Sequence, residues 1–403
     1  MSMSKIKLNH NGSSNITRDI AAYFVVMLIA VAIMRYITKN IATVWIINFV
    51  GLCFVFFKYI RVASRKILLP IVIYILVCVI SILVNAKFLT SDLKGIGTNI
   101  NLIVFGISGL LIFYFYKYKP FNDELITEIF KIISVLGSIS SSFGLITGLS
   151  DISRVMSGRL GVYRAQVYGF FFGKNLYGEF VSLSIIAGIY VFTKVRKKTE
   201  LIFIVVKIVA VVLSFSRAAL LQMFVMILVY VLIYNQQYSK IIKCFFGCLC
   251  IFAVSMYYLS NTFNSFIISY VIRGNAGDAG RAQAIRNAFY NDYSIFQILL
   301  GISYSGIAYY NVDVDNTYVF LYFSGGIIKC LIYAGLLILS AYHIIKNFKY
   351  PSIKVCACVY ISYLVYAYFE CIPLMELGLL NFCFTLFLLI IPLGYNSKAN
   401  QYN

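Results

Sequence analysis

The sequence is poor in charged residues, and acidic residues are the scarcest of them. Asp and Glu number 14 among 403 residues, charged residues of both signs make up 12%, and mean hydropathy is +0.88. Soluble globular domains carry about 25% charged residues. Because apolar residues make up 61% of this chain, a soluble fold would leave large apolar patches facing water. The shortage of charge excludes a soluble globular protein and indicates an integral membrane protein.

Histidines and loop cysteines are scarce as well. The two histidines, His10 and His343, provide no metal site. None of the ten cysteines falls in a long polar loop, so no disulfide framework is expected. A polar stretch up to Asp19 precedes the first apolar run, which ends without a cleavage signature, and we therefore expect no cleavable signal peptide.

Apolar runs of a length that crosses a bilayer follow one another along the chain. A span needs roughly 20 such residues, and the runs predict an all-α, polytopic transmembrane bundle of about 12 helices. No internal repeat divides it, so residues 1–403 form a single predicted membrane domain. The predicted spans lie near residues 20–37, 41–57, 67–84, 100–116, 129–147, 169–193, 200–215, 217–234, 241–259, 316–343, 355–372 and 377–393.

Connections rich in lysine alternate with connections that are poor in it. Cytoplasmic connections of membrane proteins collect Lys and Arg, so the alternation predicts that both termini are cytoplasmic. The excess of 34 Lys and Arg over 14 acids then follows from topology, and no nucleic-acid partner is expected. Two long segments, residues 148–168 and 260–315, become extracytoplasmic loops, and their length is typical of functional loops.

Arginine, unlike lysine, is concentrated in the outward segments after residue 147. Guanidinium binds phosphate oxygens through two parallel N–H groups, whereas ammonium is a point charge. We expect these arginines to hold a diphosphate; pairing with nearby acids or lipid phosphates is the alternative. Arg217 is the sharpest candidate, because a cation between two apolar runs is costly, although a snorkelling interfacial side chain is the alternative. The arginines are Arg154, Arg159, Arg164, Arg217, Arg273, Arg281 and Arg286.

A polar cluster opens the span that follows, in Gly173–Glu179. On a helix, Asn175 and Glu179 share a face at i and i+4. Lys174 lies where it can reach an anion near the helix N-terminus, where the helix dipole also favours negative charge. A helix-capping patch is the alternative interpretation.

The long outer loop carries three further elements. Residues 280–290 predict a surface helix lying on the membrane, and the glycines in 299–306 predict a tight turn. Asp313 and Asp315 precede the Asn316–Tyr318 element at the mouth of the next span. They are candidates for a general base or for orienting a sugar hydroxyl, and solvated loop acids are an equal alternative. Two carboxylates are too few to predict a divalent metal.

The order of these elements resembles the Wzy-type O-antigen and capsular polysaccharide polymerases and the related O-antigen ligases. The resemblance covers residues 165–340 by motif and the rest by topology. Its motifs are Lys-Asn-x-x-Gly at 174–178, Ser-Arg-Ala at 216–218, Gly-Arg at 280–281, Leu-Leu-Gly-x-x-x-x-Gly at 299–306, Asn-x-Tyr at 316–318 and Gly-Gly-Ile-Ile at 325–328.

The resemblance implies a GT-C-like multi-span glycosyltransferase of the bacterial cytoplasmic (inner) membrane, with its active site on the extracytoplasmic face. Its substrate is an undecaprenyl-diphosphate-linked oligosaccharide, and the growing glycan is transferred to the terminal sugar hydroxyl of the next repeat unit. No cofactor, metal or nucleotide sugar is needed, and a chain-length regulator protein is a further partner to consider.

The resemblance also suggests roles for individual residues. Asp315, Asp313 and Arg281 are the expected catalytic residues. Members of the wider family often have His where this chain has Asp315, which favours a carboxylate base and the polymerase over the ligase. The expected substrate-binding residues are Arg217, Arg159, Arg164, Lys174, Asn175, Arg273, Arg286, Asn316 and Tyr318.

Two other functions stay open. One is an O-antigen ligase, which joins finished glycan to another acceptor. The other is a flippase or transporter for lipid-linked sugars, a class that places ionisable residues near the bilayer midplane. Lys207 and Lys329 are the main candidates for such residues.

Overall fold

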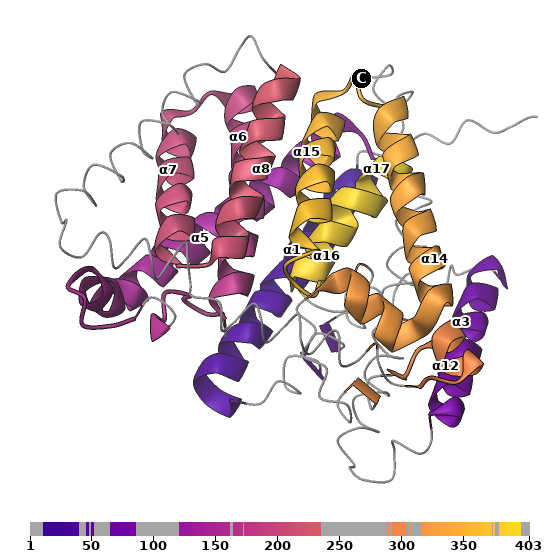
Figure 1. Cartoon of the computed structure of the whole chain (residues 1–403). Coiled ribbons are helices and arrows are strands. Elements are labelled where there is room, and N and C mark those ends of the chain that lie inside the picture. Colours follow the sequence, from indigo (N-terminus) through magenta and orange to yellow (C-terminus); the bar gives the residue numbers. More distant parts are fainter. Residues whose placement is uncertain are drawn as a thin grey trace, which may run out of the picture.

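The regular structure of the chain is helical wherever it is described. The computed structural model contains no β-strand in these parts, and one isolated bridge joins Phe121 to Tyr395. The predicted all-α class is therefore confirmed (Figure 1). The described residues are 11–39, 46–47, 50–51, 65–85, 121–161, 164–171, 173–234, 289, 292–303, 306–307, 316–372, 374 and 379–395.

The principal elements follow the apolar runs of the sequence. They are α1 (Asn11–Ile33), η1 (Met34–Thr38), α3 (Arg65–Val84), α5 (Asp123–Met156), α6 (Lys174–Val195), α7 (Lys198–Leu213), α8 (Arg217–Tyr234), α12 (Ile295–Leu300), α14 (Thr317–Lys346), α15 (Pro351–Tyr366), α16 (Leu379–Thr385), η4 (Leu386–Ile390) and α17 (Ile391–Gly394).

In the part of the chain that the structure describes, five helices are long and apolar enough to cross a membrane. They are Arg18–Thr38, α5, α6, α8 and α14, and α15 and the segment Leu379–Gly394 are shorter apolar helices. These helices support a membrane protein, by length and composition. The larger predicted number of spans stays a prediction. The spans expected at 67–84 and 200–215 form α3 and α7, which are not among these five helices. Those expected at 100–116 and 241–259 lie outside the described residues, and that at 41–57 lies largely outside them.

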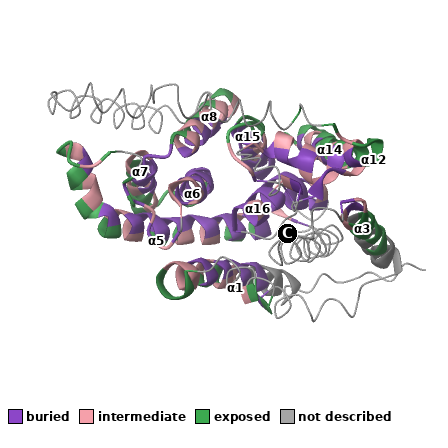
Figure 2. Ribbon diagram, turned by 60° about the horizontal axis from the view of Figure 1, so that its bottom comes forward, coloured by how far each residue is buried: buried purple, intermediate pink, exposed green. Residues whose placement is uncertain are grey.

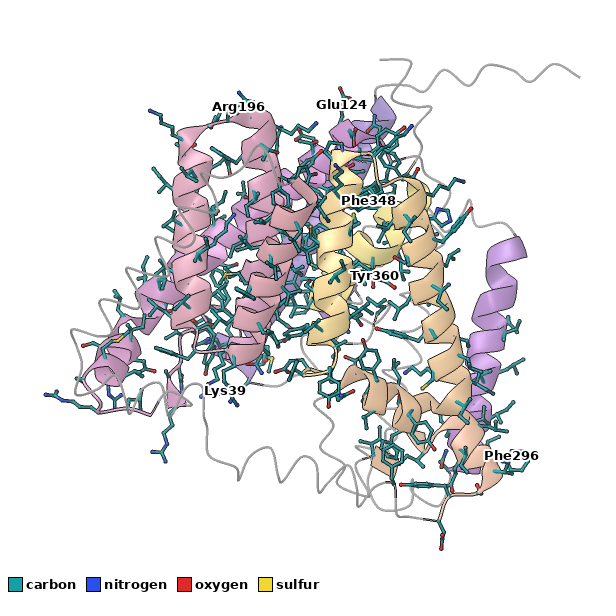
Figure 3. The ribbon with its side chains drawn as sticks, turned by 45° about the horizontal axis from the view of Figure 1, so that its top comes forward. Lys39, Glu124, Arg196, Phe296, Phe348 and Tyr360 are labelled. Carbon is teal, nitrogen blue, oxygen red and sulfur yellow. The ribbon has the colours of Figure 1, made fainter. Side chains whose placement is uncertain are left out.

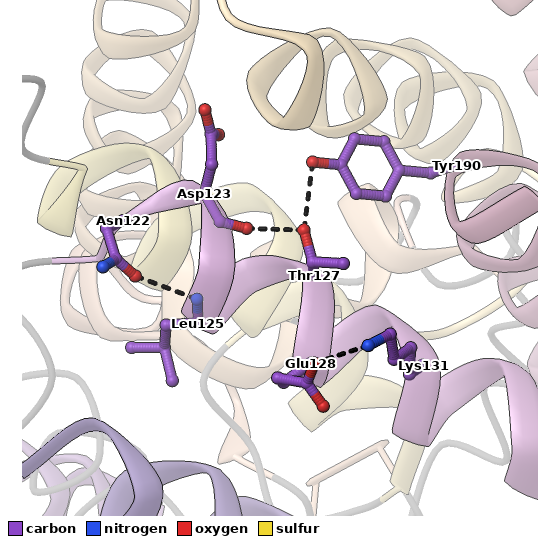
Figure 4. A network of polar contacts seen from close by, with 7 residues as sticks. All are labelled: Asn122, Asp123, Leu125, Thr127, Glu128, Lys131 and Tyr190. Atoms are coloured by element: carbon purple, nitrogen blue, oxygen red, sulfur yellow. Dashed lines mark hydrogen bonds and ion pairs between the residues drawn. The ribbon is translucent and has the colours of Figure 1, made fainter. Parts of the chain in front are cut away.

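Polar side chains define the first turn of α5 (Figure 4). Asn122 caps the helix by accepting a hydrogen bond of 2.9 Å from the backbone N–H of Leu125. Thr127 donates to the Asp123 carbonyl at 2.6 Å, and its hydroxyl lies 3.4 Å from that of Tyr190 on α6. The cap thus starts α5 at a defined residue and joins this end of α5 to α6.

Helix α5 is longer than a bilayer requires. Its 34 residues make a helix about 50 Å long, whereas the hydrocarbon core is about 30 Å thick. Residues 148–156, predicted as the start of an outer loop, are the last turns of this helix. The irregular part of the predicted 148–168 segment therefore begins only at Ser157.

Helix α6 occupies the centre of the α5–α8 group. Every residue from Tyr177 to Val191 is buried, and α6 packs against α5, α7 and α8 (Figure 2). Small residues make this packing possible: a Cβ added at Gly137 of α5 would collide with Ser184, and one at Gly144 with the ring of Tyr177. Close approach through small residues is typical of helices packed in membranes.

Helix α14 is bent at Gly326, where φ is +66° (Figure 1). Gly301, with φ +78°, ends α12 against this bend, and a Cβ on Gly301 would lie 2.5 Å from the nitrogen of Gly325. The N–H of Ile302 donates to the carbonyl of Phe323 at 2.7 Å. The predicted Leu-Leu-Gly turn and the Gly-Gly-Ile-Ile element therefore meet, because only glycine permits so close a backbone approach with positive φ.

The two ends of the bundle differ in the type of cation that predominates; Figure 3 labels one cation at each end, Lys39 and Arg196. We call the end at which α6, α8 and α14 begin the site end. It carries mostly arginine, and the opposite end mostly lysine. At the site end lie Arg35, Lys39, Arg154, Arg159, Arg164, Lys174 and Arg217, and at the opposite end Lys194, Arg196, Lys197, Lys198, Lys346, Lys349 and Lys354.

Candidate functional site

Hydrogen bonds at the site end join four segments that are far apart in the sequence. Ser216, just before α8, donates to the side-chain oxygen of Asn175 in α6 at 2.8 Å. The amide nitrogen of Asn175 donates to a carboxylate oxygen of Glu370 at 2.5 Å. Thr317, the first residue of α14, donates to the backbone carbonyl of Glu370 at 2.6 Å. We call Ser216, Asn175, Glu370 and Thr317 the polar chain.

Thr317 fixes the turn that carries Glu370. Its side chain is fully buried and its hydroxyl accepts from the N–H of Ile372 at 2.8 Å, while its own N–H donates to the carbonyl of Ala367 at 2.8 Å. The turn after α15 is thus attached to the start of α14 on both sides of Glu370. Thr317 therefore fixes the backbone at Glu370, and Asn175 binds its carboxyl group.

Gly178 allows the starts of α6 and α8 to approach. A Cβ at this position would lie 2.6 Å from the Cβ of Ala219 and 3.1 Å from the hydroxyl of Ser214. One turn further on, Ser182 donates to the carbonyl of Ala219 at 3.1 Å. The glycine of the Lys-Asn-x-x-Gly motif is required because a larger residue would separate Asn175 from Ser216.

The polar atoms of the Asn-x-Tyr element hold the backbone. Asn316 caps α14 by accepting from the N–H groups of Tyr318 and Val319, and it donates to the carbonyl of Tyr368 at 2.8 Å. The hydroxyl of Tyr318 donates to the carbonyl of Leu364 at 2.9 Å. Both residues flank Thr317 of the polar chain and bind the backbone of α15 and the turn after it. Their binding of substrate stays a prediction.

The predicted anion-binding side chains in the described region also lie at this end. Arg217 follows Ser216 directly, is exposed, and its guanidinium forms no ion pair or hydrogen bond with the described part of the chain. Arg159 and Arg164 are exposed in the segment after α5, and Lys174 is half-buried at the first position of α6. An unpaired guanidinium beside the polar chain is available to an anionic ligand.

The remaining predicted site residues lie outside the described residues. Asp315 directly precedes Asn316 in the sequence, and Asp313 precedes it by three positions. Their roles are therefore predictions from the sequence alone. The residues concerned are Arg273, Arg281, Arg286, Asp313 and Asp315.

Sequence reasoning missed Glu370 and Arg35 as members of this end. A span was predicted at 355–372, but α15 ends at Tyr366 and Glu370 lies in the following turn. Arg35 donates to the carbonyl of Phe171 at 2.5 Å and lies 4.1 Å from the ring centre of Tyr168. The available signal was the rarity of acids, since an acid at the end of an apolar run needs a reason.

Three polar side chains lie deeper in the bundle. Lys207 of α7 is fully buried and donates to the hydroxyl of Ser134 at 2.7 Å and the carbonyl of Ser184 at 3.3 Å. Glu179, one turn beyond Asn175 on the same face of α6, is fully buried with no partner for either carboxyl oxygen among the described residues. Gln222 of α8 is also fully buried, and neither its side-chain nitrogen nor its side-chain oxygen has a hydrogen-bond partner among the described residues.

No three His, Cys, Asp or Glu side chains come together as a metal site in the parts of the chain that are described.

Comparisons of the chain with protein-family models, curated proteins and solved structures found no match. The site is therefore interpreted from its own chemistry: the exposed guanidinium of Arg217, and the carboxyl group of Glu370 that Asn175 holds.

Proposed function

We propose that the protein is a Wzy-type polysaccharide polymerase, a GT-C-like membrane glycosyltransferase. It joins undecaprenyl-diphosphate-linked oligosaccharide repeat units into O-antigen or capsular polysaccharide on the outer face of the bacterial cytoplasmic membrane. The observation that carries the proposal is the polar chain, because Asn175, Ser216 and Thr317 belong to three of the motifs that define the resemblance. Motifs separated by up to 142 positions have no local reason to meet at one end of a bundle.

The chemistry of the site end supports a lipid-borne diphosphate as the ligand. The diphosphate lies at the membrane surface, and it gains charge as the glycosidic bond to it breaks. Arg217 is exposed at that end beside the polar chain, with further arginines at Arg159 and Arg164. Guanidinium groups stabilise such developing charge when they are already in position.

Lys207 favours the second candidate, a flippase or transporter for the same lipid-linked sugar. Ionisable residues inside transmembrane bundles usually mark a transport pathway. In this chain the Nζ of Lys207 donates hydrogen bonds to Ser134 and Ser184. These contacts also agree with a structural role, in which Lys207 holds α5, α6 and α7 together. A ligase would use the site end in the same manner but with a different acceptor.

Reconstitution of the full chain with lipid-linked single repeats separates these functions. A polymerase converts the repeats into a ladder of longer glycans without nucleotide sugar, a flippase moves them unchanged, and a ligase needs a different acceptor. A single-repeat product in every condition would contradict the proposal.

Arg217→Ala is expected to lower the rate of ladder formation by at least about 100-fold, because it removes a donor to the departing diphosphate. Arg217→Lys should recover only part of the rate, since it keeps the charge and loses the two-pronged contact. Arg196→Ala, an exposed arginine at the opposite end, is the matched control. Equal rates for Arg217→Ala and the control would remove the diphosphate contact from the proposal.

A further inference from the structure

We propose that Glu370 accepts the proton of the acceptor sugar hydroxyl, and that Asn175 and Ser216 are the residues that position its carboxylate. This inference rests on the proposed polymerase function. It differs from the expectation drawn from the sequence, which assigned the base to Asp313 or Asp315.

The hydrogen bonds orient the Asn175 amide. The hydroxyl of Ser216 donates to Oδ1 of Asn175 and accepts from the N–H of Ala219 at 3.3 Å. With Oδ1 occupied by that donor, Nδ2 faces Glu370 and donates to Oε1 at 2.5 Å. An amide N–H that donates to a carboxylate oxygen favours the ionised form, which is the form that can accept a proton.

Glu370 differs from the other described acids of the site end in its exposure and in the residues that it contacts. Asp151 is occupied by the N–H of Gln166 at 2.9 Å and by Arg154 at 3.6 Å. Glu179 is fully buried, and Asp292 precedes α12. Glu370 is half-buried and is joined to both the α6 and the α14 motifs.

The step balances within the two lipid-linked substrates and Glu370. The acceptor O–H bond breaks and its proton passes to the Glu370 carboxylate, while the oxygen electron pair forms the new bond to the anomeric carbon. The bond from that carbon to the diphosphate oxygen breaks, and its electron pair leaves with undecaprenyl diphosphate beside Arg217. Glu370 then releases the proton to water.

The charged and titratable side chains of the elements that meet at Glu370 define the background for a pH measurement. They include Lys174 and Glu179 on α6, Arg217 at the start of α8, Tyr318 on α14, and Tyr368 and Cys371 in the turn that holds Glu370.

The test measures initial rates of ladder formation against pH, together with binding of the lipid-linked repeat. Glu370→Gln keeps the shape and should lower the rate by about 100-fold or more, with repeat binding unchanged. Glu370→Asp keeps the carboxylate, and its rate should lie between the rates of the parent and of Glu370→Gln. Asp292→Asn, an exposed acid at the same end, is the control and should retain the parental rate.

Ser216→Ala tests the positioning role. Without its hydroxyl the Asn175 amide is no longer oriented, so the carboxylate loses a donor that favours its ionised form. The acidic limb of the pH–rate profile should then move to higher pH. A lower rate with an unmoved profile would assign Ser216 to the structure alone and overturn its positioning role.

The outcomes distinguish this inference from the proposed function. Absence of a ladder from the parent protein contradicts the polymerase. If the parent protein forms a ladder, two results overturn the role of Glu370. One is equal rates for Glu370→Gln and Asp292→Asn. The other is that Asp315→Asn is the only acid variant that stops chain growth. If Glu370→Gln fails to insert, the pH–rate profile of Glu370→Asp decides between the outcomes. An acidic limb that moves relative to the parent supports the role of Glu370, and an acidic limb that does not move overturns it.

Discussion

The structure distinguishes buried polar side chains that have hydrogen-bond partners from those that have none among the described residues. Lys207 is fully buried, and the two acceptors of its Nζ are a hydroxyl and a carbonyl, both uncharged. A buried amino group depends strongly on such contacts, because the loss of an acceptor leaves one of its desolvated N–H groups without a hydrogen bond. Ser140, on the same helix as Ser134, is also fully buried, yet its hydroxyl has no partner in the described region.

Ser134→Ala should therefore lower the free energy of unfolding by about 1–3 kcal/mol, because it removes an acceptor from Lys207. Ser140→Ala should leave stability unchanged or raise it, since it removes a buried hydroxyl that has no described partner. Unfolding of the two variants in detergent provides the measurement. Equal losses in both would show that the contact with Lys207 contributes nothing.

At the scale of elements, the start of α6 depends on its contact with the start of α8. Gly178 lies against Ala219 and Ser214, whereas Gly173, the N-cap of α6, has no atom within 4 Å of an added Cβ. The two glycines flank Asn175 but differ in the room around them. They therefore separate the effect of packing from the effect of local backbone change.

Gly178→Ala is expected to cost about 1–3 kcal/mol of stability by overpacking and to slow ladder formation, because it moves Asn175 away from Ser216. Gly173→Ala, at an extended φ of −153°, should leave both properties close to the parent. Unfolding in detergent and the reconstituted assay measure the two effects. Unchanged activity in Gly178→Ala would show that the spacing of α6 and α8 does not affect the site.

For the whole molecule, the segregation of arginine and lysine determines the expected orientation. The connection between α6 and α7 holds Lys194, Arg196, Lys197 and Lys198, which predicts a cytoplasmic position. The cations of the site end are mostly arginine, and the proposed diphosphate ligand gives them a reason to face outward.

Single cysteines at Ser157→Cys and Lys197→Cys, in a background without the ten native cysteines, test the orientation. Both positions are exposed, the first after α5 at the site end and the second between α6 and α7. A membrane-impermeant thiol reagent should label Ser157→Cys in intact cells and Lys197→Cys only after lysis. The reverse pattern would place the site end in the cytoplasm and contradict the proposed reaction.

The sequence by itself determined the helical, membrane-embedded class and several helix bounds. The predicted span at 217–234 coincides with α8, and that at 67–84 differs from α3 by two residues at its start. The reason is local: a long apolar run in lipid must satisfy its own backbone hydrogen bonds, and a helix does so within the segment. The motifs at Asn175 and Asn316 could also be located from residue types alone.

Only the tertiary structure decided which segments meet. The contact between Asn175 and Glu370 spans 195 positions, and the bend at Gly326 divides what hydropathy presents as one continuous span. Hydropathy cannot encode either feature, because a face that packs on another helix and a face that meets lipid are equally apolar. The choice of neighbours depends on small residues and buried polar pairs, whose partners exist only after the helices have packed.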